Sequence, residues 1–238
     1  MSVYLCHERP DLLEFDTEIV DSRPGAVVLA RSALHPGGGG QVADRARLMH
    51  RDGVAQIVDV SLERGRYWHV LDSNVELHGE VAVSIDGAHR LRVAQLHTVT
   101  HILNALVFRH FEGALVTGAQ INADGTARMD FDLPEVENDR LRALEPELND
   151  VIRQALDVRA TYVPLKEART TAGLIRSASV APPPTPDGRL RIVEINGLDR
   201  QACGGTHLTN TAESPPVRIA KIENKGRRNR RVRLALTG

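Results

Sequence analysis

Four residues of this chain have the types and spacing needed to bind one metal ion. His97 and His101 are four positions apart in a segment of helical character, so their imidazoles lie on one helix face, one turn apart. Cys203 and His207 repeat that spacing far downstream and add a thiolate and a third imidazole. Zinc binds such sulfur and nitrogen ligands in tetrahedral sites. The sequence therefore predicts a Zn²⁺ site formed by His97, His101, Cys203 and His207.

The pattern leaves the role of the metal open. Four protein ligands close the tetrahedron, as in structural zinc sites, whereas a hydrolytic zinc usually keeps one position for water. Either one ligand is not always bound, or zinc positions a substrate while another group activates water. The catalytic group is then a zinc-bound or zinc-positioned water, and no protein base is assigned. A zincin protease is disfavoured, because Thr98 stands where its motif has glutamate.

A run of four glycines, residues 37–40, is the second unusual feature. Such a run cannot form a stable helix or strand interior. Two interpretations remain: a flexible surface loop, or a loop whose backbone N–H groups approach a ligand. It is not a Walker loop, because no Gly-Lys-Ser/Thr follows it.

Composition limits the class of protein. The chain has 238 residues, 42% of them hydrophobic and only 3% aromatic, which predicts a folded core of Leu, Val, Ile and Ala. Two cysteines, Cys6 and Cys203, are no disulfide framework and favour a metal site in a reducing compartment. The N-terminus has no signal-peptide pattern, and no run is long enough for a membrane helix. We expect a soluble, cytoplasmic protein.

Charge is balanced overall, at −1, but concentrated locally. From residue 217 onward the chain has eight basic residues and the single acid Glu223, which gives a strong local positive field on a nearly neutral protein.

Hydrophobic periodicity divides the chain in two. Short β-type runs with turn signals between them predict a small closed barrel over residues 1–87, with strands at 15–20, 26–30, 46–49, 55–60, 66–71 and 80–85. Residues 88–238 alternate helical and strand patterns. We expect helices at 88–111, at 134–157 with a break at Pro146, and at 167–174, and strands at 114–121, 126–131, 158–165, 190–195, 217–222 and 231–236. Residues 197–205 are expected to be loop. The fold class is α+β, with a mostly antiparallel sheet packed on helices.

Together these motifs resemble the editing domain of alanyl-tRNA synthetase and its free-standing relatives, the AlaX proteins, in particular their intermediate-size class. The resemblance covers nearly the whole chain. It rests on His97-x-x-x-His101, Cys203-Gly204-Gly205-Thr206-His207, Pro36-x-x-Gly39-Gly40-Gln41-x-x-Asp44, Val116-Thr117-Gly118-Ala119-Gln120-Ile121 and the basic segment 221–231. Departures are His35, where the family often has an aromatic residue, and Gly37-Gly38, which extend the glycine run.

The resemblance implies zinc-dependent hydrolysis of mischarged tRNA(Ala) in trans, chiefly Ser-tRNA(Ala) and also Gly-tRNA(Ala). By resemblance, Thr117 contacts the seryl hydroxyl, although an ordinary strand threonine is the alternative, and Gln120 holds the terminal adenosine or the ester carbonyl. The other expected substrate-binding residues are Thr100, Gly39, Gly40 and Gln41. With tRNA as the implied partner, the basic residues Lys225, Arg227, Arg228, Arg230 and Arg231 are expected to bind its phosphates, the alternative being a solvated charged face. Two other functions are a zinc-stabilised RNA-binding module without turnover and a deacylase for another mischarged tRNA. The sequence does not indicate the oligomeric state.

Overall fold

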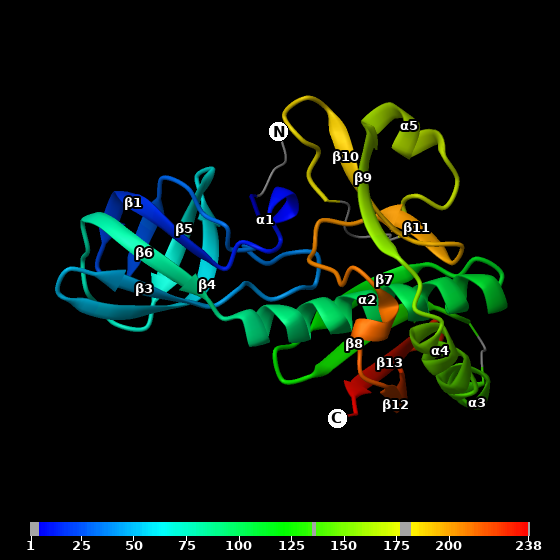
Figure 1. Ribbon diagram of the computed structural model, residues 1–238. Coiled ribbons are helices and arrows are strands. Elements are labelled where there is room, and N and C mark those ends of the chain that lie inside the picture. The colour runs from blue at the N-terminus through cyan, green and yellow to red at the C-terminus, as the bar shows by residue number, and fades with distance from the viewer. Residues whose placement is uncertain (1–4, 135–136, 177–181, 238) are drawn as a thin grey trace. The chain divides into compact units, whose positions relative to one another are not determined.

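The computed structural model describes residues 5–134, 137–176 and 182–237, and the chain forms two compact units (Figure 1). The first unit contains the residues up to Gly38 together with Val42–Leu91. The second contains Arg92–Gly238 and, in addition, the three residues Gly39–Gln41. The tip of the glycine-rich segment therefore packs with the second unit, although it is flanked in sequence by the first.

The first unit is a closed antiparallel barrel, which confirms the predicted small barrel. Its strands follow the order β1-β2-β5-β4-β3-β6 around the barrel. They are β1 (Glu14–Arg23), β2 (Ala26–Leu29), β3 (Ala46–His50), β4 (Gly53–Glu63), β5 (Arg66–Leu71) and β6 (Gly79–Ile85), preceded by the short helix α1 (Leu5–Glu8). Alternate side chains point inward, and the core is mainly aliphatic, with Leu48, Ile57 and Val83 at most 1% exposed.

His69 on β5 is an exception to this apolar interior. It is 2% exposed, and its Nε2 and Nδ1 lie 2.9 Å from Ser32 Oγ and 3.3 Å from the Val27 carbonyl oxygen. Burial among uncharged groups lowers the pKa of His69 to about 4, although the Val27 carbonyl partly opposes the shift. The barrel therefore holds this imidazole neutral.

The long helix α2 (Gly87–His110) matches the helix predicted over residues 88–111. Every residue from Leu96 to Val107 is buried, so the helix has no solvent-facing side over three turns. In Figure 1 one sheet of the second unit is drawn on either side of it. Polar side chains in such a helix need hydrogen-bond partners or bound ligands. The polar residues in question are His97, Thr98, Thr100, His101 and Asn104.

Two antiparallel sheets make up most of the second unit, so the predicted α+β class is confirmed. One has the order β12-β13-β8-β7 and the other β11-β10-β9. The strands are β7 (Val116–Ile121), β8 (Thr126–Asp132), β9 (Val158–Pro164), β10 (Arg189–Ile195), β11 (Asp199–Ala202), β12 (Val217–Asn224) and β13 (Asn229–Leu236). The remaining helices are α3 (Asn138–Arg142), α4 (Leu144–Arg153), α5 (Leu165–Thr170) and the 3₁₀ turn η1 (Thr211–Glu213).

Several elements differ from the sequence-based expectations; α5, for example, spans Leu165–Thr170 rather than residues 167–174. The segment expected to be helical from Pro134 begins as α3 at Asn138, with residues 135–136 outside the described ranges, and it breaks at Ala143 rather than at Pro146. Pro146 lies in the first turn of α4, where its missing N–H has no helical partner to lose. Residues 199–202, expected to be loop, form β11 and pair with β10.

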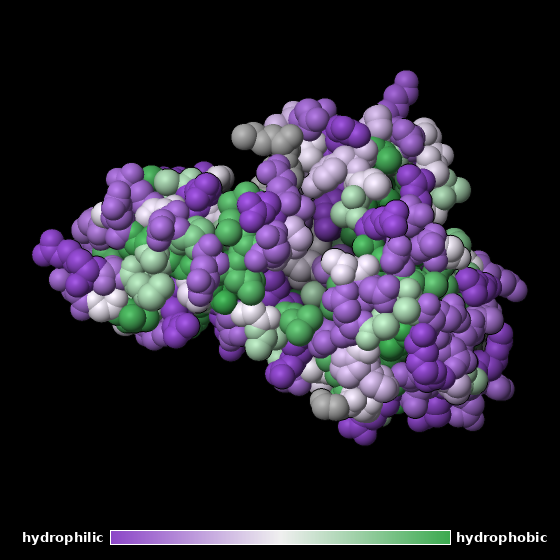
Figure 2. Space-filling model, viewed as in Figure 1, coloured by the Kyte–Doolittle hydropathy of each residue, from purple (hydrophilic) through white to green (hydrophobic). Residues whose placement is uncertain are grey.

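In the described ranges, no helix is long and apolar enough to cross a membrane. The face drawn in Figure 2 is mainly hydrophilic, with apolar residues in separate small groups.

Candidate metal centre

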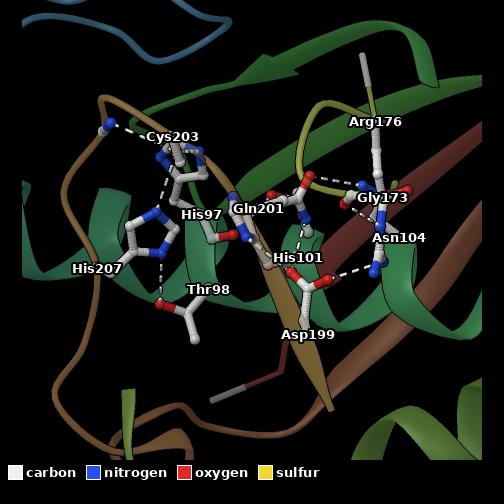
Figure 3. A network of polar contacts seen from close by, with 12 residues as sticks. His97, Thr98, His101, Asn104, Gly173, Arg176, Asp199, Gln201, Cys203 and His207 are labelled. Carbon is white, nitrogen blue, oxygen red and sulfur yellow. Dashed lines mark hydrogen bonds and ion pairs between the residues drawn. The ribbon is translucent and has the colours of Figure 1, made fainter. Parts of the chain in front are cut away.

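The structure brings His97, His101, Cys203 and His207 together. His97 and His101 of α2 lie beside the segment that follows β11. One donor atom from each of the four residues lies within 4.8 Å of all the others. The Nε2 atoms of His97 and His207 are each 3.3 Å from Cys203 Sγ (Figure 3). Zinc bonds of about 2.0 Å to nitrogen and 2.3 Å to sulfur place tetrahedral ligands about 3.5 Å apart. The spacing of the donor atoms therefore suits a zinc-sized ion.

A tight turn carries Cys203 and His207 to this position. A Cβ atom on Gly205 would lie 2.1 Å from His97 Cε1 and 2.5 Å from Gln41 Oε1, so only glycine fits there. The guanidinium of Arg191 donates from Nη1 to the carbonyl oxygens of Cys203 and Gly205, at 2.9 and 3.0 Å. The close packing at Gly205 and the hydrogen bonds from Arg191 together fix the conformation of this turn.

The Nδ1 atoms of the three histidines each have a different hydrogen-bond partner. Nδ1 of His97 lies 2.7 Å from Gln41 Oε1, and Nδ1 of His101 lies 3.2 Å from Asp199 Oδ2. Nδ1 of His207 lies 3.2 Å from Thr98 Oγ1, which also accepts a bond from the Leu208 N–H.

These partners determine which nitrogen of each ring carries the proton. A carboxylate oxygen and an amide oxygen can only accept, so His97 and His101 must donate from Nδ1. The amide of Gln41 is oriented by Thr206, whose backbone N–H donates to Gln41 Oε1 at 3.0 Å and whose hydroxyl accepts from Gln41 Nε2 at 3.0 Å. With Nδ1 protonated, Nε2 presents its lone pair toward Cys203, which is the tautomer that metal ligation requires.

The electrostatics of the cluster favour a thiolate. Burial raises the pKa of the Cys203 thiol, but the three neighbouring imidazoles outweigh it and hold that pKa well below its ordinary range. Burial lowers the pKa of His101, whereas the Cys203 charge and the Asp199 hydrogen bond raise it to about 9. Burial and the neighbouring His97 hold the pKa of His207 well below its ordinary value. A cation is thus favoured beside the thiolate, and a metal ion would take the place of the His101 proton.

The glycine-rich segment contributes Gln41 to this centre. Gly40 has a φ of +91°, and a Cβ there would lie 2.7 Å from the Ala119 carbonyl oxygen. The Gly40 carbonyl accepts the Ile121 N–H of β7 at 2.7 Å, which holds Gln41 buried beside His97. Gly39 is exposed. The loop therefore packs its backbone closely against β7 at Gly40 and places Gln41 beside His97, while contact of its backbone N–H groups with a ligand stays a prediction.

The other predicted substrate residues lie elsewhere in the second unit. Thr100 is buried, and its hydroxyl donates to the His97 carbonyl oxygen at 2.7 Å. Thr117 and Gln120 are exposed on β7. The Thr117 hydroxyl donates to Asn229 Oδ1 at 3.2 Å, and Gln120 contacts Asn122 and Arg128.

The basic residues of the terminal hairpin differ in how available they are. Lys225 and Arg227 are exposed at the turn between β12 and β13. Arg228 and Arg231 form two-pronged ion pairs with Asp132 and Asp130 on β8. Arg230 is 7% exposed. Part of the basic excess is therefore neutralised within the sheet.

Sequence reasoning missed the residues that support the ligands from behind. Asp199 and Gln201 on β11, with Arg176 and Asn104, form a buried polar network beside His101 (Figure 3). One signal was available: Asp199, Gln201 and Cys203 alternate along the chain, as strand residues sharing one face do.

Comparison with known proteins first defines a class. Residues 190–233, which run from β10 into β13 and include Cys203 and His207, match the family model described as "Threonyl and Alanyl tRNA synthetase second additional domain". This part of the chain is thus similar to an accessory domain of threonyl- and alanyl-tRNA synthetases.

Full-length relatives then define the family. The chain is 36% identical over 224 residues to the alanyl-tRNA editing protein AlaX-M of Saccharolobus solfataricus, covering 92% of each chain. It is 35% identical over 218 residues to AlaX-M of Methanosarcina barkeri, covering 88% of each. It is also 32% identical over 219 residues to the alanine–tRNA ligase of Methanopyrus kandleri, covering 89% of this chain and 23% of the ligase. The chain belongs to the AlaX-M family of alanyl-tRNA editing proteins.

Proposed function

We propose that this chain is a zinc-dependent aminoacyl-tRNA deacylase that removes serine, and also glycine, from mischarged tRNA(Ala). Alanyl-tRNA editing follows from its family, whose AlaX-M members are matched over almost their whole length. The observation that carries the zinc-dependent part is the donor set. Three imidazoles hydrogen-bonded through Nδ1 and one cysteine converge from two segments of the chain.

The residues assigned to the metal are His97, His101, Cys203 and His207. A bound zinc supplies Lewis-acid chemistry, polarising an ester carbonyl or lowering the pKa of a water. The chain itself supplies orientation: Gln41, Thr98 and Asp199 hold the three imidazoles with Nε2 directed inward. Because four protein ligands fill a tetrahedron, one ligand has to leave or the coordination has to expand if substrate is to reach the metal.

Selection of serine over alanine has a physical basis in a second, hydrolytic site. The aminoacylation pocket of a synthetase discriminates poorly against an amino acid that is smaller than the correct one or that differs from it by one added hydroxyl. A site that hydrogen-bonds the seryl hydroxyl would leave its own polar group unpaired with alanine, and would spare Ala-tRNA(Ala). We assign this contact to Thr117, whose hydroxyl lies on the exposed side of β7 and donates to Asn229. Gln120, which is also exposed on β7, is assigned to the terminal adenosine or the ester carbonyl at the tRNA 3′ end.

We assign contacts with tRNA phosphates chiefly to Lys225 and Arg227. Both are exposed at one hairpin turn, and Arg227 makes no ion pair with any residue in the described ranges. Arg228 and Arg231 would have to exchange Asp132 and Asp130 for phosphate, and Arg230 is buried. The latter three are therefore assigned a supporting role.

The decisive experiment compares ester hydrolysis of Ser-tRNA(Ala), Gly-tRNA(Ala) and Ala-tRNA(Ala) by the zinc-loaded protein. We expect rapid loss of serine, slower loss of glycine and no loss of alanine above the rate in buffer. Zinc and tRNA binding without seryl-ester loss would instead identify an RNA-binding module. Preferred hydrolysis of another member of an aminoacyl-tRNA panel would identify a different deacylase.

Replacing Thr117 by valine separates these functions further. The substitution keeps the shape of the side chain and removes the hydroxyl, so we expect the preference for seryl over alanyl ester to fall while zinc remains bound. Unchanged discrimination would contradict the role assigned to Thr117.

A further inference from the structure

Asp199, the first residue of β11, is a buried carboxylate with three hydrogen-bond donors. Its side chain has no solvent exposure. Oδ2 accepts from His101 Nδ1 at 3.2 Å and from Gln201 Nε2 at 2.6 Å, and Oδ1 accepts from Arg176 Nη1 at 2.8 Å. Desolvating a carboxylate costs several kcal/mol unless such partners offset it. Asp199 thus connects His101 to the guanidinium of Arg176, whose side chain is 13% exposed (Figure 3).

Arg176 is itself held in place on two sides. Its Nε donates to the Gly173 carbonyl oxygen at 2.9 Å. Its Cζ lies 4.3 Å from the centre of the Phe108 ring, which belongs to α2. A guanidinium stacked on an aromatic ring and hydrogen-bonded to backbone has little freedom left. It therefore fixes the plane of the Asp199 carboxylate.

Gln201 and Asn104 secure the other side of the network. Gln201 Oε1 accepts from Asn104 Nδ2 at 3.0 Å, so the Gln201 amide must point its nitrogen toward Asp199. Asn104 is three positions after His101 on α2, and therefore lies on the same side of the helix. Its Oδ1 is buried without a hydrogen-bond partner in the described ranges. The network joins α2 to β11 through side chains alone.

We propose that Asp199 and Arg176 are positioning residues for the metal ligand His101. Asp199 fixes the Nδ1–H tautomer and the ring orientation of His101, and Arg176 holds the Asp199 side chain in a single geometry. Carboxylate–histidine pairs of this kind increase metal affinity by orienting the ligand and raising its basicity. The inference rests on the proposed zinc site and deepens it, because it assigns residues outside the four ligands to metal retention.

The test is zinc affinity, measured by competition with a chromophoric chelator, in wild type, Asp199→Asn and Arg176→Lys. An asparagine cannot present oxygen to His101 and Arg176 at once, and its amide NH₂ facing His101 would select the wrong tautomer. We expect a 10- to 100-fold loss of zinc affinity for Asp199→Asn, on the order found for outer-shell partners. Arg176→Lys keeps the charge but loses the planar fork, and should lose a few-fold.

The matched control is Asp130→Asn. Asp130 belongs to the same unit and also pairs with arginines, Arg128 and Arg231. It makes no hydrogen bond or ion pair with the four proposed metal ligands. It should keep wild-type zinc affinity, which separates a specific effect from a general loss of stability. Circular dichroism checks that each variant is folded. If Asp199→Asn does not fold, Arg176→Lys alone decides.

The outcomes distinguish two failures. Suppose that the wild-type chain binds zinc and that Asp199→Asn, or Arg176→Lys where that variant decides, binds it with the same affinity. This result would overturn the positioning role and leave the proposed zinc site standing. An equal loss in Asp130→Asn would overturn it as well. Absence of zinc binding by the wild-type chain would overturn both the proposed site and this inference.

Discussion

His69 in the barrel and His101 on α2 are buried almost equally, at 2% and 7% exposure, yet their pKa values shift in opposite directions. Around His69 there is a hydroxyl and a carbonyl, and the loss of water dominates, so the pKa falls to about 4. Around His101 there is a thiolate and a carboxylate, and these outweigh the same loss, so the pKa rises to about 9. Burial depth alone does not determine the charge of a histidine; its neighbours do.

The comparison extends to the two units as a whole. The barrel closes around aliphatic side chains, and the buried ion pair between Asp44 and Arg90 has both partners in the barrel unit. The second unit places hydrogen-bond acceptors and a thiolate around three imidazoles, two of them on the buried part of α2. A buried thiolate beside imidazoles that present Nε2 favours a bound cation. The donor atoms of the proposed metal centre are therefore concentrated in the second unit.

The largest expected effect on zinc binding comes from replacing Cys203, and the other buried cysteine, Cys6 in the barrel unit, is its control. Cys203→Ser replaces a thiolate with a hydroxyl, a poor zinc ligand, so we expect zinc to be lost on dialysis and deacylation to fall to background. Cys6→Ser, at a site 2% exposed in the barrel unit, should retain zinc and activity. Metal analysis and seryl-tRNA hydrolysis give the readouts. Zinc retention by Cys203→Ser would contradict the assignment of the metal centre to the second unit.

Acid should destabilise the protein through His69. Because its folded pKa of about 4 lies below the ordinary 6.5, the unfolded chain binds the proton first, and stability present above pH 6.5 is lost as the pH falls toward 4. A shift of this size corresponds to at most about 3 kcal/mol. His69→Gln should flatten this part of the pH dependence of urea unfolding, whereas the exposed His78→Gln should not. Parallel curves for wild type and His69→Gln would contradict the prediction.

Two adjacent glycines test the link between the glycine-rich segment and the metal centre. Gly39 and Gly40 both have positive φ, so alanine costs about 1 kcal/mol of backbone strain at either site. Only at Gly40 would the added Cβ meet a neighbour, the Ala119 carbonyl. Gly40→Ala should shift Gln41 away from His97 and lower zinc affinity by roughly 10-fold. Gly39→Ala should change it little, and equal effects of the two would argue against the contact.

The smallest effect concerns RNA. Removing one phosphate-binding side chain reduces the dependence of log affinity on log salt by about one unit. Arg227→Gln should therefore lower this slope for tRNA(Ala) by about one, with a modest loss of affinity. Arg51→Gln, at a 90% exposed arginine of the barrel, should leave the slope unchanged. Filter binding at several salt concentrations measures both, and the reverse result would move the RNA surface to the barrel.

Local pattern was enough to predict the barrel strands, α2 and the terminal hairpin, because each has an apolar period that survives without knowledge of its neighbours. The pairing of Cys203 and His207 with His97 and His101 followed from ligand chemistry rather than periodicity. That route works because few other roles require these residue types at this spacing.

β11 shows why the rest could not be predicted. Asp199, Arg200 and Gln201 look like a polar loop, since the reason for burying two of them is a histidine 98 positions earlier. Gln41 was likewise expected to contact substrate, and its partner His97 is 56 positions away. Partners of this kind are set by tertiary geometry, and a pattern within a few residues does not contain them.

The contact between Gln41 and Thr206 spans 165 positions, and the one between His97 and Cys203 spans 106. During synthesis the barrel strands are therefore complete while most of the metal centre does not yet exist. His101 Nδ1 and His97 Nε2 reach their partners, Asp199 and Cys203, only after the segment 199–207 has been synthesised. Contacts this distant in sequence form slowly. The proposed metal centre is thus assembled only after residue 207 has been synthesised, and the pairing of β12 with β13 and of β13 with β8 draws on residues later still.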